Sequence, residues 1–331
     1  MRRRIAYLLL ALGAAAALGG CGSTSDRPLR ITLAALGTKA REPKLKPVRP
    51  EPQCSDLRAS LRPPAVMPAP GAMPPRSFMA TIKRHGYLLV GVNSGLLGFG
   101  YLNPFTGRIE GFEIDLAGEL ARAIFGEPGH LRLKALTVTQ RIPSVQHGKV
   151  DIVIDAVTIL CSRRQQVDFS TVYYDAQQGV LVPTSSKARG LQDLGGKRVC
   201  ASAGSAPISV IKQQPSHPIA VGLPQAIDCL VYLQQGRVDA ISTDDSILSG
   251  FRAQDPHTKL VGPSVAKVPY GMAISKAHPE FVRFVNGVLA RMRKDGTWRR
   301  LYARWVGKLA HTKTTPAPPT AQYETTAQYE R

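Results

Sequence analysis

The sequence predicts an α/β protein with two lobes, each built on a parallel sheet and joined by a double crossover of the chain. Short apolar strands alternate with amphipathic helices through residues 77–308, which is typical of parallel α/β sheets. This pattern restarts after Gly195 and Gly196, and a further apolar strand follows late, at residues 269–274. A restart followed by a late return favours two lobes over one continuous sheet.

The first lobe is expected to begin with residues 77–183. Residues 87–92 and 150–154 are apolar runs of the kind that form buried strands. Between them, residues 113–125 place apolar side chains at helical spacing. Two strands connected through a helix in this way are expected to lie parallel in one sheet.

The second lobe is expected at residues 184–268, where the same pattern is repeated. A strand at residues 197–201 is followed by a helix at residues 230–235 and a second strand at residues 238–242. The order of these elements again predicts a parallel sheet.

Residues 269–308 are expected to return to the first lobe. They contain a helix, residues 281–294, with Pro279 at its start and Gly296 at its end, which are the positions that these two residue types favour. Ligands of open α/β sheets bind at the carboxyl ends of the strands, so two facing lobes predict a cleft between them.

The N-terminus is typical of an exported protein. Residues 1–20 contain three arginines, an apolar run too short to cross a bilayer comfortably, and two glycines before Cys21, which predicts a signal peptide. The residues Leu18-Gly19-Gly20-Cys21 resemble the bacterial lipobox, so we expect lipidation of Cys21 and an extracytoplasmic, membrane-anchored protein. The alternative is an ordinary secretory signal with Cys21 as a structural cysteine.

Both ends of the chain differ in composition from the region between them. Residues 21–76 are rich in proline, arginine and lysine, which predicts an extended tether. Residues 309–331 contain a proline-rich stretch and repeat the sequence Thr-Ala-Gln-Tyr-Glu, which predicts a disordered tail.

The chain is strongly basic, with a formal charge of +20 from 43 lysines and arginines against 23 acidic residues. Removal of the three arginines at positions 2–4 with the signal peptide lowers this charge from +20 to +17. The basic residues are scattered rather than gathered with aromatic residues into one patch, and export also argues against a nucleic-acid partner.

Five cysteines suggest a lipid anchor and two disulfides. With Cys21 set aside, four cysteines remain in an oxidising compartment, and they allow three connectivities. Cys200 and Cys229 are expected in one lobe and therefore favour pairing with each other, which leaves Cys54 with Cys161. The sequence contains no Cys-x-x-Cys motif and no histidine cluster, so neither a metal site nor a cofactor is expected.

The run Gly111-Phe112-Glu113-Ile114-Asp115-Leu116 resembles the signature of the polar amino-acid binding proteins of ABC importers, which are solute-binding proteins of family 3. Other segments resemble the family in order and spacing between residues 77 and 307: Ile142-Pro143, Val150-Asp151-Ile152, Val167-Asp168-Phe169-Ser170, Asp193-Leu194-Gly195-Gly196-Lys197, Val238-Asp239-Ala240 and Gly296-Thr297-Trp298. Asp244-Asp245 and the set Cys161, Cys200 and Cys229 resemble glutamine-binding-type lipoproteins of actinobacteria.

The resemblance implies the two-lobed type II fold of periplasmic binding proteins and a function in binding. It implies that a monomer captures a polar amino acid between the lobes and presents it to an ABC permease. Two alternatives stay open, a lipoprotein that senses amino acids for a membrane receptor and a dehydratase-like enzyme on the same fold. No second catalytic domain fits in the proline-rich segments, so we expect no enzyme.

The resemblance also implies the ligand-binding residues. Arg163 matches the arginine that grips the α-carboxylate with its planar fork, and Thr158 matches a residue that assists it. Asp244 matches the carboxylate that accepts the α-ammonium, while Ser205 and Ala206 match a turn whose backbone N–H groups meet the carboxylate. The alternatives are a surface cation at position 163 and a helix cap at position 244.

Four positions depart from the family pattern. Asn93 stands where many members carry aspartate, and Leu96 and Val138 occupy the positions of aromatic platforms, for which Phe99 and Tyr101 are candidate substitutes. Asp155 lies where the ligand side chain is often approached. If it is ionised and faces the cleft, it disfavours acidic ligands and favours cationic or amide ligands; the alternative is an aspartate turned outward at the end of a strand.

Overall fold

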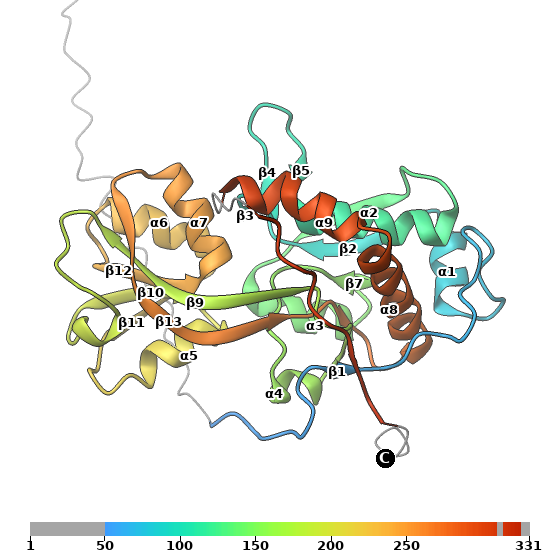
Figure 1. The fold of residues 1–331 in the computed structure, drawn as a ribbon, viewed down its shortest axis with the longest axis horizontal. Coiled ribbons are helices and arrows are strands. Elements are labelled where there is room, and N and C mark those ends of the chain that lie inside the picture. The colour runs from blue at the N-terminus through green and yellow to red at the C-terminus, as the bar shows by residue number, and fades with distance from the viewer. Residues whose placement is uncertain (1–49, 310–313, 326–331) are drawn as a thin grey trace, which may run out of the picture. The chain divides into compact units, whose positions relative to one another are not determined.

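The computed structural model describes residues 50–309 and 314–325 and shows two lobes, each containing a five-stranded sheet (Figure 1). The predicted signal peptide and Cys21 lie outside these residues. No helix in residues 50–309 or 314–325 combines the length and the apolar character that crossing a bilayer requires.

The sheet of the first lobe has a parallel centre and antiparallel strands on one side. Strand β2 pairs parallel with β6 and β7, whereas β14 pairs antiparallel with β7 and β8. The order of strands is β6 (Leu131–Ala135), β2 (Leu88–Val92), β7 (Ile152–Val153), β14 (Ala273–Ile274) and β8 (Asp168–Phe169). The predicted strand at residues 150–154 is therefore shorter than expected.

The helices of the first lobe follow the predicted patterns, and α2 is the clearest case. It begins after Gly111, whose φ of 143° is unfavourable for other residues, and an added Cβ there would lie 2.1 Å from the carbonyl oxygen of Phe99. The lobe contains α1 (Phe78–His85), α2 (Phe112–Phe125), a 3₁₀ helix (Val138–Gln140), α3 (Arg141–Gln146), α4 (Cys161–Arg164), α8 (Pro279–Lys294), α9 (Thr297–Tyr302) and a π-helical turn (Ala303–Gly307).

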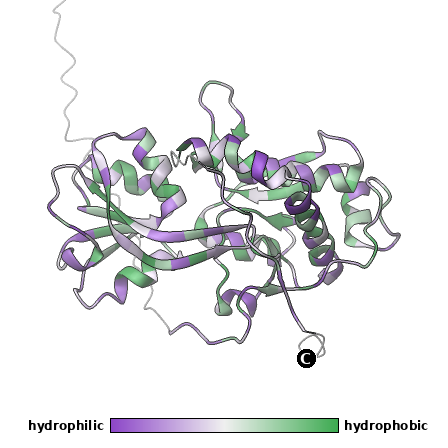
Figure 2. Cartoon of the chain, viewed as in Figure 1, coloured by the Kyte–Doolittle hydropathy of each residue, from purple (hydrophilic) through white to green (hydrophobic). Residues whose placement is uncertain are grey.

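A small three-stranded sheet is attached to the first lobe before α2. Its antiparallel strands are β3 (Gly95–Leu96), β4 (Gly100–Leu102) and β5 (Ile109–Glu110). Figure 2 shows hydrophobic and hydrophilic residues alternating along the larger helices, as expected of helices with one buried face.

The second lobe is built on the sheet order β11-β10-β12-β9-β13. Its parallel strands β10, β11 and β12 confirm the predicted α/β class, while β9 and β13 add an antiparallel side. The elements are β9 (Tyr174–Pro183), a 3₁₀ helix (Leu191–Asp193), β10 (Arg198–Ser202), α5 (Ala206–Lys212), β11 (Ile219–Leu223), α6 (Ala226–Gln234), β12 (Ala240–Asp244), α7 (Asp245–Gln254) and β13 (Thr258–Tyr270).

The two crossings between the lobes are made by the long strands β9 and β13, which run side by side (Figure 1). They pair from Tyr174 with Tyr270 to Pro183 with Thr258, with an irregularity between Val261 and Ala266. Residues 174–183 therefore pair in the sheet of the second lobe while they form one of the crossings. Long strands that pair across the crossing were not evident from the apolar pattern, because that pattern is local.

The structure differs from the sequence-based expectations at both ends of the described residues. Residues 50–76, expected to be part of a tether, lie against the first lobe, where Leu61 is buried and Met67 contacts Gly287. Part of the expected disordered tail forms strand β15 (Gln322–Tyr323), which pairs parallel with β1 (Ala59–Ser60). Few apolar residues are needed for these contacts, so composition did not reveal them.

Two disulfides join the four remaining cysteines in the favoured pairing. Cys200 on β10 is bonded to Cys229 on α6, inside the second lobe. Cys54 is bonded to Cys161, the first residue of α4, across 107 positions of sequence. One disulfide therefore fixes a lobe internally, whereas the other fixes a chain end to a lobe.

Candidate functional site

A narrow cavity lies between the lobes, at the ends of β12 and β10. The first lobe lines it with Leu96, Val138, Arg141, Ala156, Thr158 and Arg163, and the second with Ser202, Ser205, Ala206, Pro207, Ala226, Thr243, Asp244 and Ile247. Five of the predicted ligand-binding residues are in this set. The cavity volume is about 20 Å³, which is room for about one water molecule, so a larger ligand requires the lobes to move apart.

Arg163 reaches from the first lobe to the second. The residue belongs to α4 and is half-buried; its Nη1 donates to the carbonyl oxygen of Thr158 at 2.8 Å, and its Nη2 donates to the carbonyl oxygen of Gly204 at 3.1 Å. Desolvation lowers the pKa of Arg163 to about 10, with Arg141 acting in the same direction. The guanidinium is therefore still protonated at neutral pH.

Asp244 presents a free acceptor from the other side of the cavity. Its Oδ2 accepts a hydrogen bond from the Tyr270 hydroxyl at 2.5 Å, while its buried Oδ1 has no partner in the described part of the chain. Burial raises the pKa of Asp244 to about 6. A buried carboxylate oxygen without a donor is costly, and a cation in the cavity would satisfy it.

The structure does not show the alternative role of the Asp244 side chain as a helix cap. The side chain of Asp244 makes no capping hydrogen bond to α7. Instead Asp245 accepts from the backbone N–H groups of Gln177 and Ser246 through its Oδ1. Asp244 is thus left for the cavity while its neighbour serves the backbone.

The cavity is also lined by three other predicted ligand-binding residues, Ser205, Ala206 and Thr158. Ser205 is the N-cap of α5, and its hydroxyl oxygen accepts from the backbone N–H of Ile208. Ala206 lines the cavity beside it. Thr158 is held by a bridge to Tyr270 of β13, which places it next to the crossing between the lobes.

Asp155 does not line the cavity, contrary to the expectation that it approaches a ligand. It is fully buried, and both its oxygens accept hydrogen bonds from Arg141, from Nε at 2.8 Å and from Nη2 at 2.9 Å. Arg141 itself lines the cavity, and its Nη1 has no partner among the described residues. The carboxylate therefore balances an arginine that the sequence-based prediction missed.

Asn93 and Phe99 are also placed away from the cavity wall. The Asn93 amide donates to Oε1 of Gln225 at 3.2 Å, so it connects the two lobes beside the cavity. Phe99 is 1% exposed and packs edge-on against Phe112 and Tyr174 in the core. Leu96 and Val138 line the cavity with aliphatic side chains, whereas Phe99 does not line it.

Glu113, from the signature run at the start of α2, shapes the cavity from behind. Its Oε1 accepts from the Ala156 backbone N–H at 2.7 Å and from the Tyr173 hydroxyl. Ala156 lines the cavity and has a φ of 44°, a left-handed conformation that is rare for a residue other than glycine. Burial raises the pKa of Glu113 to about 7. A buried acid thus fixes an unusual turn in the wall.

The cavity therefore joins a fixed cation, a free anionic oxygen and a second arginine whose charge is balanced. This arrangement matches a zwitterion with a carboxylate and an ammonium group. In the residues that the structure describes, no three histidine, cysteine, aspartate or glutamate side chains are grouped to hold a metal ion. Arg141 could have been noticed from its position directly before Ile142-Pro143, within a segment that resembles the family.

Comparisons with known proteins identify a family for most of the chain. The model of the bacterial extracellular solute-binding proteins, family 3, matches residues 88–308. The chain is 32% identical over 232 residues to the ABC transporter glutamine-binding protein GlnH of Bacillus subtilis, covering 70% of this chain and 85% of that one. It is 36% identical over 196 residues to a glutamine-binding protein of Geobacillus stearothermophilus, covering 59% and 75%.

A solved structure is similar over the same region. It is that of an ancestral arginine-binding protein bound to glutamine, with a TM-score of 0.63 and 33% sequence identity, and the match covers 67% of this chain and 98% of that one. The chain ends described above, before residue 88 and after residue 308, fall outside the match to the family.

Proposed function

This chain belongs to the bacterial extracellular solute-binding proteins of family 3, and from that premise we propose that it captures a polar amino acid between its lobes for an ABC importer. Members of this family bind solutes and are not enzymes, which removes the dehydratase alternative. The two glutamine-binding relatives support a ligand of the glutamine type.

The observation that carries the proposal is that Arg163 and Asp244 line one cavity from opposite lobes, and that Oδ1 of Asp244 has no hydrogen-bond partner among the described residues. A guanidinium binds a carboxylate through two parallel hydrogen bonds. A buried carboxylate oxygen without a donor suits an ammonium group. The α-carboxylate and α-ammonium of an amino acid would therefore bridge the two lobes.

Lobe closure follows from the position of these groups on opposite lobes. Hydrogen bonds already join the lobes at and beside the cavity, from Arg163 to Gly204, from Asn93 to Gln225, and from Gln225 to the carbonyl oxygen of Leu136. Closure about β9 and β13 is a hinge motion, in which a few residues at the ends of elements absorb the change. A ligand that bridges the lobes would favour the closed form by its extra contacts.

The side-chain end of the ligand would meet Arg141 rather than Asp155. Because Asp155 balances the charge of Arg141, this end of the cavity offers N–H donors with little net charge. Such donors suit the carbonyl oxygen of an amide, and a cationic side chain would be disfavoured. We therefore propose glutamine as the first ligand to test.

We also propose that the protein is a lipoprotein anchored through Cys21, which keeps it at the membrane next to its permease. Replacement of Cys21 by alanine would then release the protein from the membrane fraction. Retention of the Cys21→Ala protein on the membrane would contradict the anchor. A partner that is a membrane receptor instead of a permease would show a sensing role.

A thermal-shift screen against the common amino acids tests the proposal, because a ligand that binds only the folded state raises its apparent stability. We expect glutamine to give the largest shift, and Arg163→Ala to abolish it. Arg299→Ala, which removes an exposed arginine of α9, is the control and should leave the shift unchanged. No response to any amino acid, or a full response in Arg163→Ala, would sink the assignment.

A further inference from the structure

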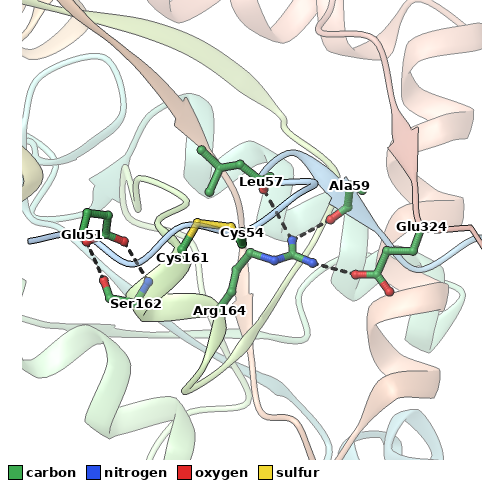
Figure 3. The surroundings of a disulfide bond; sticks show 8 residues. All are labelled: Glu51, Cys54, Leu57, Ala59, Cys161, Ser162, Arg164 and Glu324. Carbon is green, nitrogen blue, oxygen red and sulfur yellow. Dashed lines mark hydrogen bonds and ion pairs between the residues drawn. A yellow bond between two sulfur atoms is a disulfide. The ribbon is translucent and has the colours of Figure 1, made fainter. Parts of the chain in front are cut away.

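Both chain ends of the described structure are attached to the same short helix, α4. Figure 3 shows Glu51 and Cys54 from the N-terminal segment and Glu324 from the C-terminal tail around this helix. These three residues lie outside the region that matches the family, residues 88–308. The contacts therefore come from segments outside the family-matched region.

Helix α4 cannot be stable by itself, because its four residues form a single turn. Its N-cap, Leu160, provides no side-chain hydrogen bond to the free N–H groups of that turn. The carboxylate of Glu51 provides it instead: Oε1 accepts from the Ser162 backbone N–H at 2.8 Å, and Oε2 accepts from the Ser162 hydroxyl at 2.9 Å.

The last residue of α4, Arg164, is bound by both chain ends at once. Its Nη1 donates to the carbonyl oxygen of Ala59 at 2.6 Å, and its Nη2 donates to Oε1 of Glu324 at 2.6 Å. Both side chains of this ion pair are about one-fifth exposed, at 22% and 20%, so solvent screens it less than a fully exposed pair. The Glu324 backbone N–H also donates to the carbonyl oxygen of Ser60.

The chain ends are themselves fixed to a long helix, so their contacts can hold α4 in place. Asn286 of α8 donates to Oγ of Ser60 and to the carbonyl oxygen of Leu61, each at 2.7 Å. Arg293 of the same helix donates to the carbonyl oxygen of Pro319 at 3.0 Å. The parallel pairing of β1 with β15 joins the two ends to each other.

Three of the four residues of α4 are therefore held from outside, and the fourth is Arg163. Cys161 is bonded to Cys54, Ser162 to Glu51, and Arg164 to Ala59 and Glu324. Arg163 alone in this turn faces the cavity. A binding group that is fixed before the ligand arrives loses less freedom on binding, which increases affinity.

We propose that the two chain ends form a clamp on α4, and that Glu51, Cys54, Arg164 and Glu324 are positioning residues for Arg163. The affinity for the ligand then depends on segments outside the family-matched region. The part of this inference that concerns affinity rests on the proposed function, whereas the part that concerns the order of α4 does not.

Two readouts on the full chain separate these parts. The double variant Glu51→Gln/Glu324→Gln is compared with Glu119→Gln/Glu127→Gln, which changes two surface acids away from α4. Hydrogen exchange of residues 158–167 without ligand measures the order of α4, and calorimetry with L-glutamine measures affinity. We expect the clamp variant to exchange roughly tenfold faster and to bind roughly tenfold more weakly, and the control to change less than twofold.

The disulfide variant Cys54→Ser/Cys161→Ser gives a second route to the same result, with Cys200→Ser/Cys229→Ser as its matched control. The Cys54→Ser/Cys161→Ser variant should speed the hydrogen exchange of residues 158–167, whereas the control variant should not. Unchanged exchange in both clamp variants overturns the clamp, and faster exchange with an unchanged dissociation constant overturns the positioning role. A wild-type protein that binds no amino acid overturns the proposed function instead, while the exchange measurement still decides the clamp.

Discussion

Arg163 and Asp244 lie on opposite sides of one cavity, and the two lobes hold them in different ways. Arg163 sits on a single helical turn whose outside contacts come from residues 105 to 160 positions away in sequence. Asp244 ends a buried strand, β12, and directly precedes the ten-residue helix α7. One pole is therefore supported by the two ends of the described chain, and the other by the sheet and the helix of its own lobe.

The two poles are vulnerable to different changes. A group supported by local secondary structure is lost only when that structure unfolds. A group on an isolated turn is sensitive to substitutions, proteolysis or reduction far from the cavity. Changes at the chain ends should therefore affect the first lobe's side of the site and leave the second lobe's side intact.

Removal of the disulfides should give the largest effect and separates the two kinds of support. The loops closed by Cys54–Cys161 and Cys200–Cys229 span 107 and 29 positions. Chain entropy then predicts losses in unfolding free energy of about 5 and about 4 kcal/mol for the respective serine pairs. Denaturant titration under oxidising conditions measures both. A larger loss of unfolding free energy for Cys200→Ser/Cys229→Ser than for Cys54→Ser/Cys161→Ser would contradict this prediction.

Removal of the poles themselves should come next. Arg163→Ala and Asp244→Asn should each weaken glutamine binding by about 3 kcal/mol, or roughly a hundredfold, because each leaves a charged group of the ligand without its partner. The two variants should differ in stability: Asp244→Asn should raise the melting temperature at pH 7, since the buried carboxylate is costly there, and Arg163→Ala should not. Equal changes in melting temperature for the two variants would contradict the expected difference between the poles.

The affinity should depend on pH through Asp244 and not through Arg163. Since the pKa of Asp244 is about 6, it must lose a proton before it accepts an ammonium group at lower pH. Affinity should therefore fall roughly tenfold between pH 7 and pH 5. Calorimetry in buffers of different ionisation enthalpy would detect the released proton. Asp244→Asn should remove the pH dependence of the affinity, although Glu113, whose pKa is about 7, is still present in that variant.

The same shift in pKa predicts the sign of a stability change. The folded pKa of Asp244 lies above the ordinary aspartate value of 3.8, so the folded state binds more protons between about pH 4 and pH 6. The free energy of unfolding should fall as pH rises through this window. Asp244→Asn should flatten the curve there, and an unaltered slope in that variant would assign the proton to another group.

The smallest predicted effect concerns ligand choice. Asp155→Asn removes the counter-charge of Arg141, so the preference for glutamate over glutamine should rise about fivefold, or about 1 kcal/mol. The variant also leaves a buried arginine unpaired and loses stability, so the readout is the ratio of the two affinities in one protein. An unchanged ratio would show that Arg141 does not contact the ligand side chain.

Most of the fold could be predicted from the sequence because its signals are local. The apolar runs around residues 87–92 and 197–201 and the stripe of α2 each report burial within a few residues. Pro279 and Gly296 bracket α8 as expected. The lengths of β9 and β13 could not be predicted, since their pairing depends on the other lobe.

The site was predictable only in part, for the same reason. Arg163 and Asp244 follow from a residue-by-residue resemblance, and both line the cavity. The direction of Asp155 depends on strand register and on Arg141, which one sequence does not show. The chain ends offered one usable clue: Cys54 pairs with Cys161, so the segment assigned to a tether had to reach the first lobe.

The hydrogen bond from Arg163 to the Gly204 carbonyl oxygen has a consequence for how binding is measured. A ligand carboxylate that takes this N–H of Arg163 would displace the carbonyl, and capture would then be an exchange of partners rather than a simple addition. The observed affinity is then a difference between an internal bond given up and an external bond gained. A substitution that shifts the turn at Gly204 away from Arg163 could make the protein bind more tightly, although it would add no contact to the ligand.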